Sequence, residues 1–542
     1  MNVAVDSDRR TTSTTVGGRW DALLIGVLAF AVSVVGAPNP SLWFDESATV
    51  SAATRSLPEM ADLLRHVDAV HGLYYLVMHA WFAVFPATEG WARVPSALFV
   101  GVAAAGVVVL GRQLSTRSVA VAAGVVFAVL PRTTWAGVEA RSYALSMVDA
   151  TWLTVLCVVA CRRNRGWLWV AYAVGVALAA VGNVFVLLVV GAHAVLVWGS
   201  GPERGRVIRS WLTAVVAATA AVAPYLLVIK SQQGQVSWIW PINPGTLGQI
   251  LGDQYFPAVY SDSARATGLD AQQTVSPEQV SAALHAWALV APFIVAVLVL
   301  AVVAVRRRAR GGPVAGSALL LRLAGAWIAV PTLVVVAYSL VGNPMYQPHY
   351  LAFTVPGLAL VLGTCVAVVG RDPRWIALIL VVLAVAATPN YVAQRGPYAK
   401  MAQDSSRVAD LVAARAADAD CLNVDVTAPP DVVEALTAGR RSAYAKLRDD
   451  GLIATGVERG ALFESRRPIT EWAGALPDCS AVWTITERDR TRPAHERADA
   501  LDPGPRLGSV AAYRVPAAMG FRAVERWQFN MTQVLRSVPP ST

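Results

Sequence analysis

The apolar positions form long uninterrupted blocks up to about residue 390, and beyond it they become short and scattered. Each block is about 15 to 22 residues long, which is the length that crosses a ~30 Å hydrocarbon layer as a helix. Arginine-bearing loops separate the blocks. The pattern therefore predicts an all-α polytopic membrane domain over residues 21–390. The candidate blocks are 21–37, 72–86, 95–111, 118–135, 143–161, 166–182, 184–200, 210–229, 283–304, 318–340, 351–370 and 375–390.

The arginine-rich loops indicate how many blocks cross. If 72–86 does not cross and residues 1–20 form a cytoplasmic tail, these loops all face the cytoplasm, as the positive-inside rule requires. Block 72–86 would reach only about 22 Å as a helix and is rich in Tyr, Trp and Phe, which favours an interfacial helix. We therefore expect about eleven spans in the plasma membrane. The predicted outer segments are 38–94, 132–142, 230–282, 341–350 and everything after 391.

Residues 391–542 have a different composition, rich in Asp, Arg, Ala and Pro, with short alternating runs such as 421–426 and 480–486. This pattern predicts a C-terminal soluble α/β domain on the outer face, of ordinary size at about 150 residues. Cys421 and Cys479 begin or precede predicted strands. An exported domain favours a disulfide between them, and two reduced thiols remain the alternative because spacing does not fix geometry.

The overall composition excludes a soluble enzyme. Of 542 residues, 55% are hydrophobic and 15% charged, whereas soluble domains carry about 25% charge. The net charge of +9 comes from arginines in short loops between spans, where they orient the chain, so we predict membrane lipids and no nucleic acid as partners. Glycine-rich phosphate loops, dinucleotide signatures and nucleophile elbows are absent from the sequence, which argues against nucleotide-driven chemistry.

Two adjacent carboxylates follow the first span. Asp45 and Glu46 lie beside Trp43 and Phe44 at the predicted outer surface, where charged groups are costly unless they are used or paired. One interpretation makes one of the two acids a general base for a sugar hydroxyl, while the other binds the acceptor or a cation. The alternative is an ordinary solvated acidic loop, because an Asp-Glu pair alone is not specific.

Cationic and aromatic residues gather in other predicted outer segments. Arg141 can bind a phosphate bidentately, with Tyr143 lining the same site; a structural pair of Arg141 with Glu139 or Asp45 is the alternative. The turn 343–350 places Tyr346, His349 and Tyr350 on this side, and a histidine there can donate to a phosphate leaving group.

A lysine and a tryptophan mark the start of the long outer loop 230–282. Lys230 is the only lysine in the membrane region, and it either snorkels to lipid headgroups or caps a lipid phosphate. Trp238 and Trp240 indicate an interfacial loop. We assign contacts with the phosphate of a lipid substrate to Arg141, His349, Lys230, Tyr143 and Tyr350. Acceptor contacts are assigned to Tyr346, Trp238 and His71.

Four motifs follow one another along the predicted membrane domain. They are Trp43-Phe44-Asp45-Glu46, His71-Gly72-Leu73-Tyr74-Tyr75, Arg93-Val94-Pro95-Ser96 and Glu139-Ala140-Arg141-Ser142-Tyr143-Ala144-Leu145. Together they resemble the GT-C superfamily of membrane glycosyltransferases, in particular the bacterial branch related to protein mannosyltransferases and lipid A aminoarabinose transferases. The resemblance covers about residues 20–390 and implies the GT-C fold, a polyprenyl-phosphate sugar donor, Asp45 as catalytic base and Arg141 with His349 as phosphate ligands. The family often has His-Pro-Pro-Leu where this chain has the shorter His71-Gly72-Leu73.

The expected function is inverting transfer of a sugar to a cell-envelope glycan or lipoglycan acceptor. Actinobacterial members of the superfamily use decaprenyl-phosphate mannose or arabinose; we expect mannose, with arabinofuranose as the alternative. No cofactor is required, and a divalent cation near Asp45 and Glu46 stays open. A lipid or sugar transporter is the competing class, but charges at one face rather than at mid-span favour an enzyme. A purely structural scaffold is the third possibility.

Overall fold

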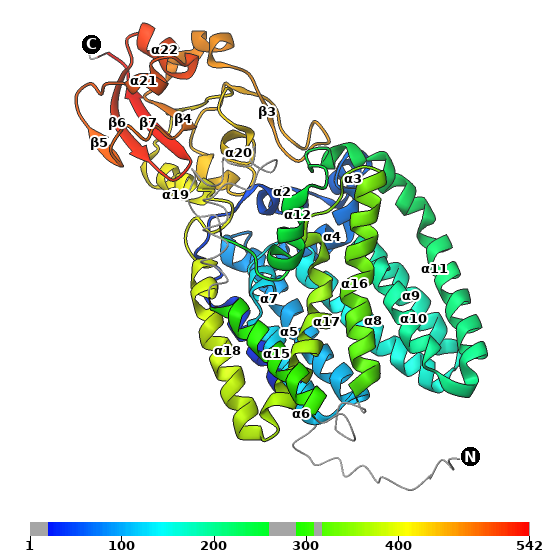
Figure 1. Cartoon of the computed structure of the whole chain (residues 1–542). Helices are drawn as coiled ribbons and strands as arrows, with labels where there is room; N and C mark the ends of the chain where they lie inside the picture. Colours follow the sequence, from blue (N-terminus) through cyan, green and yellow to red (C-terminus); the bar gives the residue numbers. More distant parts are fainter. Residues whose placement is uncertain (1–19, 260–288, 308–316, 541–542) are drawn as a thin grey trace, which may run out of the picture.

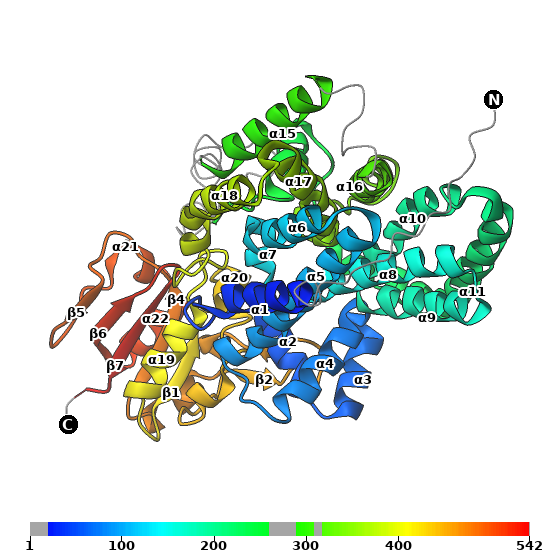
Figure 2. The ribbon, with the colours of Figure 1, turned by 90° about the horizontal axis from the view of Figure 1, so that it is seen from below.

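The computed structural model describes residues 20–259, 289–307 and 317–540, which form a helical bundle and a smaller sheet-containing domain (Figure 1). The predicted cytoplasmic tail, apart from Trp20, lies outside the described residues, as does part of the long outer loop. Figure 2 shows the sheet domain on one side of the bundle and helices α9 (Gly166–Gly182) and α11 (Arg204–Ser231) on the other.

The bundle is a multi-pass membrane domain. Among the described residues, six helical segments are long and apolar enough to cross a membrane, and five shorter apolar helices accompany them. These eleven correspond to the eleven blocks predicted to cross. The long segments are α5 (Glu89–Leu114), α8 (Tyr143–Arg163), Gly201–Ser231 containing α11, α16 (Ala318–Val341), Pro348–Gly370 containing η9 (Pro348–Thr354) and α17 (Val355–Gly370), and α18 (Pro373–Ala393). The shorter ones are α1 (Asp21–Val34), α6 (Arg117–Val129), α9, Val184–Trp198 containing η3 (Val184–Leu188) and α10 (Val189–Trp198), and Val290–Val303 within α15 (Val290–Arg307).

The predicted block 118–135 is not one helix. Helix α6 ends at Val129, Leu130 is extended, and the short helix α7 (Pro131–Ala136) begins at the next residue. The residue before a proline is disfavoured in the α conformation, so Pro131 explains the break. Because of it, Arg132 and Trp135 belong to a separate helix that lines the cavity described below.

The segment between the first two spans forms a cap of short helices: α2 (Phe44–Ala53), α3 (Leu57–His66), η2 (Ala69–His71) and α4 (Gly72–Phe82). Helix α4 covers most of the predicted interfacial helix 72–86 and ends at Phe82. At 11 residues it is about 16 Å long, too short to cross a membrane. Figure 1 shows α2, α3 and α4 at the end of the bundle that faces the sheet domain.

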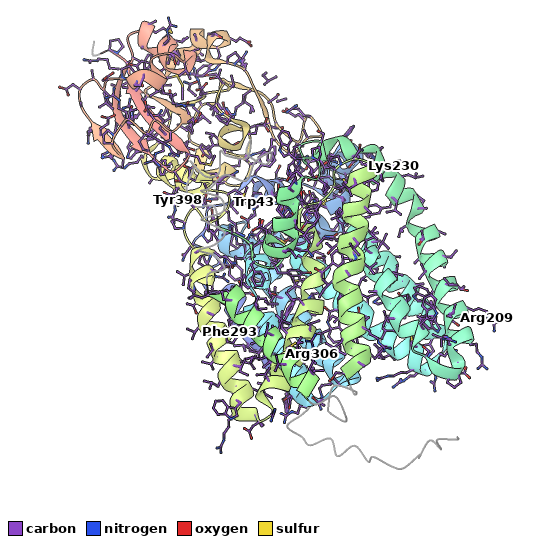
Figure 3. All side chains as sticks on the ribbon, in the orientation of Figure 1. Trp43, Arg209, Lys230, Phe293, Arg306 and Tyr398 are labelled. Atoms are coloured by element: carbon purple, nitrogen blue, oxygen red, sulfur yellow. A yellow bond between two sulfur atoms is a disulfide. The ribbon has the colours of Figure 1, made fainter. Side chains whose placement is uncertain are left out.

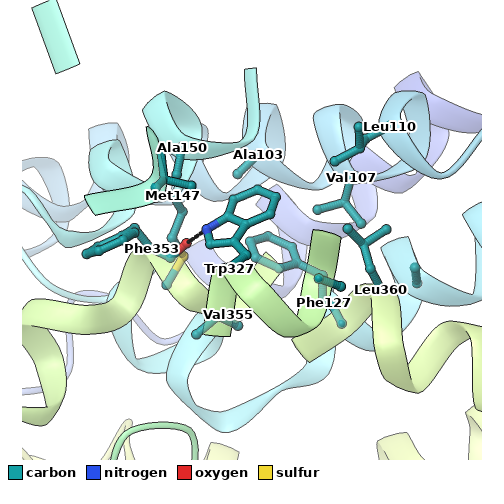
Figure 4. Packing of buried hydrophobic residues seen from close by; sticks show 14 of the residues in the cluster. Ala103, Val107, Leu110, Phe127, Met147, Ala150, Trp327, Phe353, Val355 and Leu360 are labelled. Carbon is teal, nitrogen blue, oxygen red and sulfur yellow. Dashed lines mark hydrogen bonds between the residues drawn. The ribbon is translucent and has the colours of Figure 1, made fainter. Parts of the chain in front are cut away.

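The bundle core is tightly packed around Trp327 of α16. Its side chain is fully buried, and its Nε1 donates to the Phe353 carbonyl oxygen at 2.9 Å (Figure 4). Phe127 and Leu360 contribute to the same core. Helices α1 and α5 approach closely through glycine, since a Cβ on Gly26 would lie 2.9 Å from the Gly101 carbonyl oxygen. This packing gives the cap a rigid base.

The C-terminal domain is α/β, as predicted. Its five-stranded sheet has the order β1-β4-β7-β6-β5, with β1 and β4 parallel and the other neighbours antiparallel. Helix α19 (Ser405–Arg415) packs Val408 and Val412 into the core of this domain. Cys421 and Cys479 form a disulfide, so the pairing favoured from the sequence is present. The strands are β1 (Cys421–Val424), β4 (Val482–Glu487), β5 (His495–Arg497), β6 (Arg522–Gln528) and β7 (Thr532–Val538).

Candidate functional site

A cavity of about 1100 Å³ lies where the bundle, the cap and the C-terminal domain meet. Trp43, which lines it, is located at this junction in Figure 3. The cavity brings together seven of the residues predicted from the sequence. They are Asp45, His71, Arg141, Tyr143, Trp238, His349 and Tyr350. Three other predicted residues, Glu46, Lys230 and Tyr346, do not line it.

Asp45 lies in the first turn of α2, and its side chain is 28% exposed. Its Oδ2 is 3.6 Å from Nε of Arg141, so the structure contains one of the two ion pairs considered from the sequence. Glu139, the other candidate partner of Arg141, pairs with Lys400 instead. Although burial opposes its charge, the Asp45 carboxylate raises the pKa of Arg141 above its ordinary value. A carboxylate and a permanent cation thus meet at the cavity wall.

His71 and Tyr75 hold the Arg141 guanidinium in place. Nη2 of Arg141 lies 2.9 Å from Nε2 of His71, and Nη1 donates to the Tyr75 hydroxyl at 3.1 Å. Because an arginine only donates, Nε2 of His71 must accept, which puts the imidazole proton on Nδ1. Burial, aided by Arg141, lowers the pKa of His71 to about 3, so the ring is neutral at physiological pH. His71 therefore orients Arg141.

Aromatic side chains form the neighbouring wall. The His349 ring meets Tyr143 and Tyr350 edge-on, with centroids 5.1 and 4.8 Å apart. Tyr350 stacks on Phe185 at 5.2 Å, and Trp135 lies 6.0 Å from His349. This wall offers flat apolar faces next to the Asp45–Arg141 pair.

Glu46 is not a cavity residue, although the sequence suggested a catalytic role. Its carboxylate is fully buried and bidentate with Arg93, at 2.7 Å from Nε and 2.5 Å from Nη2. It also accepts from the Ala140 backbone N–H at 2.9 Å. Despite burial, Arg93 keeps the pKa of Glu46 below its usual value. Successive side chains on a helix point about 100° apart, so only one of the adjacent acids faces the cavity.

Lys400 also lines the cavity, although no motif in the sequence marks it for a role. Its ammonium forms an ion pair with Glu139 and lies 4.9 Å from the Trp135 ring centre. Glu139 also accepts from Nε1 of Trp43 at 2.5 Å. Burial raises the pKa of Glu139 to about 7, although the Lys400 charge opposes this. The Trp43–Glu139–Lys400 contacts tie α2 to the chain entering the C-terminal domain.

The turn after Lys400 is strained and held by the C-terminal domain. Met401 and Ala402 adopt left-handed φ values of 52° and 61°. The Asn530 side chain donates to the Ala402 carbonyl oxygen at 2.7 Å, and Asp404 accepts from the Met531 N–H at 2.7 Å. Non-glycine residues in this region persist where the surroundings impose it, often at functional sites. The C-terminal domain thus delivers Lys400 to the cavity.

A second segment of the C-terminal domain, residues 459–464, covers the cap. Phe463 packs on Phe44 with centroids 4.6 Å apart. Ser51 donates to the Leu462 carbonyl oxygen at 2.6 Å, and Arg55 donates to the Ala461 carbonyl oxygen. Residues 459–464 all line the cavity, as does Glu434. This contact could not be foreseen, because hydrophobic pattern says nothing of which loop meets which helix.

Lys230 and Tyr346 are placed differently from expectation. The Lys230 side chain is exposed at the end of α11, which fits the snorkelling alternative. Tyr346 is buried and donates to Oε1 of Gln254 at 3.2 Å. In extended chain, successive side chains alternate, and Met345 and Gln347 line the cavity instead.

Among the described residues, no group of three or more His, Cys, Asp or Glu side chains is arranged to hold a metal ion.

The fold defines a class: a multi-span membrane protein with a GT-C-like bundle and a C-terminal mixed-sheet domain. No family model and no curated protein matches the chain. Its structure is similar to ArnT from Cupriavidus metallidurans bound to undecaprenyl phosphate, with 13% identity, a TM-score of 0.51, and coverage of 95% of this chain and 97% of that one. The structure of ArnT from the same organism in the apo state has 13% identity and a TM-score of 0.51, with coverage of 96% of this chain and 98% of that one. The mycobacterial arabinofuranosyltransferase AftD gives 17% identity and a TM-score of 0.45, covering 97% of this chain and 40% of AftD. At 13% identity, the likeness to ArnT establishes the fold alone.

Proposed function

We propose that the protein is a GT-C glycosyltransferase that transfers a sugar from a polyprenyl-phosphate donor to a hydroxyl of a cell-envelope glycan or lipoglycan. The observation that carries the proposal is the Asp45–Arg141 pair, 3.6 Å apart at the wall of a cavity lined by aromatic rings. A base and a phosphate-binding cation are the two groups this reaction requires. The ArnT structure of similar fold was obtained with undecaprenyl phosphate bound, which supports a lipid phosphate as substrate.

In the proposed reaction, Asp45 takes the proton of the acceptor hydroxyl as its oxygen attacks the anomeric carbon. The bond from that carbon to the phosphate oxygen breaks, and its electron pair leaves with the lipid phosphate. Arg141 and His349 interact with the departing phosphate, which carries charge and needs only oriented cations and donors. One displacement inverts the anomeric carbon. The proposed reaction requires no cofactor, and a divalent cation beside Asp45 stays open.

The acceptor is proposed to bind on the side formed by the C-terminal domain. Glu434, Arg459 and Glu464 line the cavity there, and carboxylates and guanidinium groups bind sugar hydroxyls well. Trp238, which is half exposed and also lines the cavity, keeps its proposed acceptor role. We propose mannose as the transferred sugar, with arabinofuranose on the same lipid as the alternative for direct comparison.

The cavity and the C-terminal domain are proposed to lie outside the plasma membrane, with the N-terminus in the cytoplasm. Figure 3 shows Trp43 at one end of the bundle, and Arg209 and Arg306 toward the opposite end. Exposed arginines at that end fit the positive-inside rule. The Cys421–Cys479 disulfide fits an oxidising compartment.

The test supplies membranes containing the wild-type protein with labelled polyprenyl-phosphate mannose or polyprenyl-phosphate arabinose, and label is followed into glycan and lipoglycan fractions. We expect transfer from one donor and a loss of at least about 100-fold in Asp45→Asn, the usual scale for a general base. Asp418→Asn, an exposed carboxylate of the C-terminal domain, is the matched control and should transfer normally. Absence of transfer from both donors, or undiminished transfer by a folded Asp45→Asn protein, would refute the proposal.

A further inference from the structure

A short turn in the segment between α11 and α15 forms a part of the cavity wall that the proposed reaction does not use. Residues Gln249–Asp253 form the π-helical turn η6, and Gln249 and Asp253 line the cavity with Gly245 and Gly248. π-helical turns are rare and frequently occur at functional sites. The residues that hold η6 in place therefore decide which side chains it presents to the cavity.

Gln254, directly after the turn, anchors it to the helical bundle. Its buried amide nitrogen donates to the hydroxyls of Thr332 at 3.1 Å and Thr354 at 3.3 Å. Its amide oxygen accepts from Tyr346 at 3.2 Å. The turn is thus attached to α16 and η9. Tyr346, which was expected to bind the acceptor, instead holds the Gln254 side chain in place. Such anchoring makes the turn a preorganised element.

Arg132 of α7 holds the turn from the other side. Its Nε donates to the Gln254 carbonyl oxygen at 3.1 Å, and its Nη2 donates to the Asp253 carbonyl oxygen. The guanidinium carbon lies 4.7 Å from the ring centre of Trp135. Trp135 in turn packs near Tyr143, at 5.4 Å between centroids, so the turn adjoins the aromatic wall beside Arg141.

One oxygen of the Asp253 carboxylate lacks a hydrogen-bond partner. Its Oδ1 is buried and accepts no hydrogen bond from any residue the structure describes, while the Ala258 backbone N–H bonds to the same carboxylate. Burial raises the pKa of Asp253 to about 6, although the Arg132 charge opposes this. Buried polar atoms in native proteins nearly always have a partner. Because Asp253 also lines the cavity, a hydrogen-bond donor bound there could reach its carboxylate.

The chemistry of that donor follows from the charge. A carboxylate repels a phosphate, so Asp253 does not suit the lipid phosphate group. It suits hydroxyl groups, which a neutral sugar ring presents in several directions. We propose that Asp253 accepts a hydrogen bond from a hydroxyl of the donor's sugar ring, and that Arg132 acts as a positioning residue for Asp253. This inference rests on the proposed function and adds the residue that recognises the sugar.

The test measures equilibrium binding of the detergent-solubilised full-length protein to decaprenyl phosphate, decaprenyl-phosphate mannose and decaprenyl-phosphate arabinose. Asp253→Ala should bind the sugar lipid that the wild type prefers at least about 10-fold more weakly, the usual effect of losing a hydrogen bond to a charged group. Its affinity for sugar-free decaprenyl phosphate should be unchanged. Asp253→Asn keeps an acceptor oxygen and should lie between the two, and Asp418→Asn is the control.

Arg132→Gln tests the positioning role. It should weaken binding of the same sugar lipid and leave binding of decaprenyl phosphate unchanged. Combining Arg132→Gln with Asp253→Ala should weaken binding little further, because both residues act through one contact. Equal weakening of all three lipids by Asp253→Ala, or no weakening by either Asp253 variant, would overturn the inference while leaving the proposed function standing. A wild-type protein that binds none of the three lipids would overturn both.

Discussion

Glu46 and its neighbour Asp45 have separate tasks in this site. Glu46 joins Arg93 to the Ala140 backbone, and Arg93 also donates to the Ala37 and Pro40 carbonyl oxygens at 2.7 and 2.8 Å. These contacts fix the first turn of α2 against the segment that carries Arg141. The distance between Asp45 and Arg141 therefore depends on a buried ion pair that no substrate reaches.

Glu46→Gln should consequently destabilise the protein. It leaves the Arg93 charge buried without its partner, which costs about 3–5 kcal/mol of unfolding free energy. We expect a clear fall of the melting temperature in detergent, measured by thermal unfolding, together with a loss of transfer. Asp45→Asn, at a partly exposed position, should lose transfer with little change in melting temperature. Equal melting temperatures for Glu46→Gln and wild type would contradict the assignment.

Glu139 should make the transfer rate fall on the acidic side of its pH profile. Its pKa of about 7 means that it becomes protonated as the pH falls through neutrality. Protonation removes the negative charge that pairs with Lys400, and the tie between α2 and Lys400 loosens. We expect the transfer rate of the wild type to fall between pH 8 and 6 and that of Glu139→Gln to stay low and flat. A wild-type profile without this fall, or a fall that persists in Glu139→Gln, would argue against it.

Single residues show how far sequence reasoning reaches. The motifs correctly placed Asp45 and Arg141 on one cavity, because motif residues at both segments follow spans that end on the same face. They could not separate Asp45 from Glu46, since that depends on the rotation of α2. Lys400 was missed because it meets Glu139 across 261 positions of sequence.

At the scale of elements, the loop 459–464 closes the cap, and glycine makes this closure possible. Gly460 has a φ of +56°, and a Cβ there would lie 3.0 Å from Oδ2 of Asp62 and 3.1 Å from Nδ1 of His66. Any other residue is therefore strained by its backbone and crowded by α3. The break before Pro131 is a second local backbone feature that shapes the site, because it separates α7 from α6.

Gly460→Ala should weaken acceptor binding more than donor binding. The left-handed backbone costs an L-residue about 1–2 kcal/mol, and the crowding moves the loop away from α3. We expect a several-fold higher KM for acceptor with the KM for donor unchanged, measured by steady-state transfer. Gly474→Ala is the control, because nothing lies within 4 Å of its added Cβ. A Gly460→Ala enzyme with unaltered acceptor KM would show that the loop takes no part in acceptor binding.

Block length and loop charge were enough to predict the architecture of the whole molecule. The eleven apolar helices among the described residues follow from the lengths of the apolar blocks, and the separate α/β domain follows from the change of composition near residue 391. The docking of the two parts did not follow, because contacts such as Arg440 to Glu89, at 2.8 Å, depend on side chains far apart in the chain. The site lies at that docking interface.

The proposed orientation predicts which ends of the molecule are accessible from outside. Arg497 is exposed in the sheet domain, and Arg209 is labelled toward the opposite end of the bundle in Figure 3. A membrane-impermeant maleimide should label Arg497→Cys in intact cells, whereas Arg209→Cys should react only after permeabilisation. The reverse result would place the cavity in the cytoplasm.

A structure of the Asp45→Asn protein with decaprenyl-phosphate mannose or decaprenyl-phosphate arabinose bound tests the proposed site most directly. We expect a lipid phosphate within hydrogen-bonding distance of Arg141, and the anomeric carbon facing residue 45. A headgroup seated in this cavity with its phosphate remote from Arg141, or a lipid bound only elsewhere on the bundle, would contradict it.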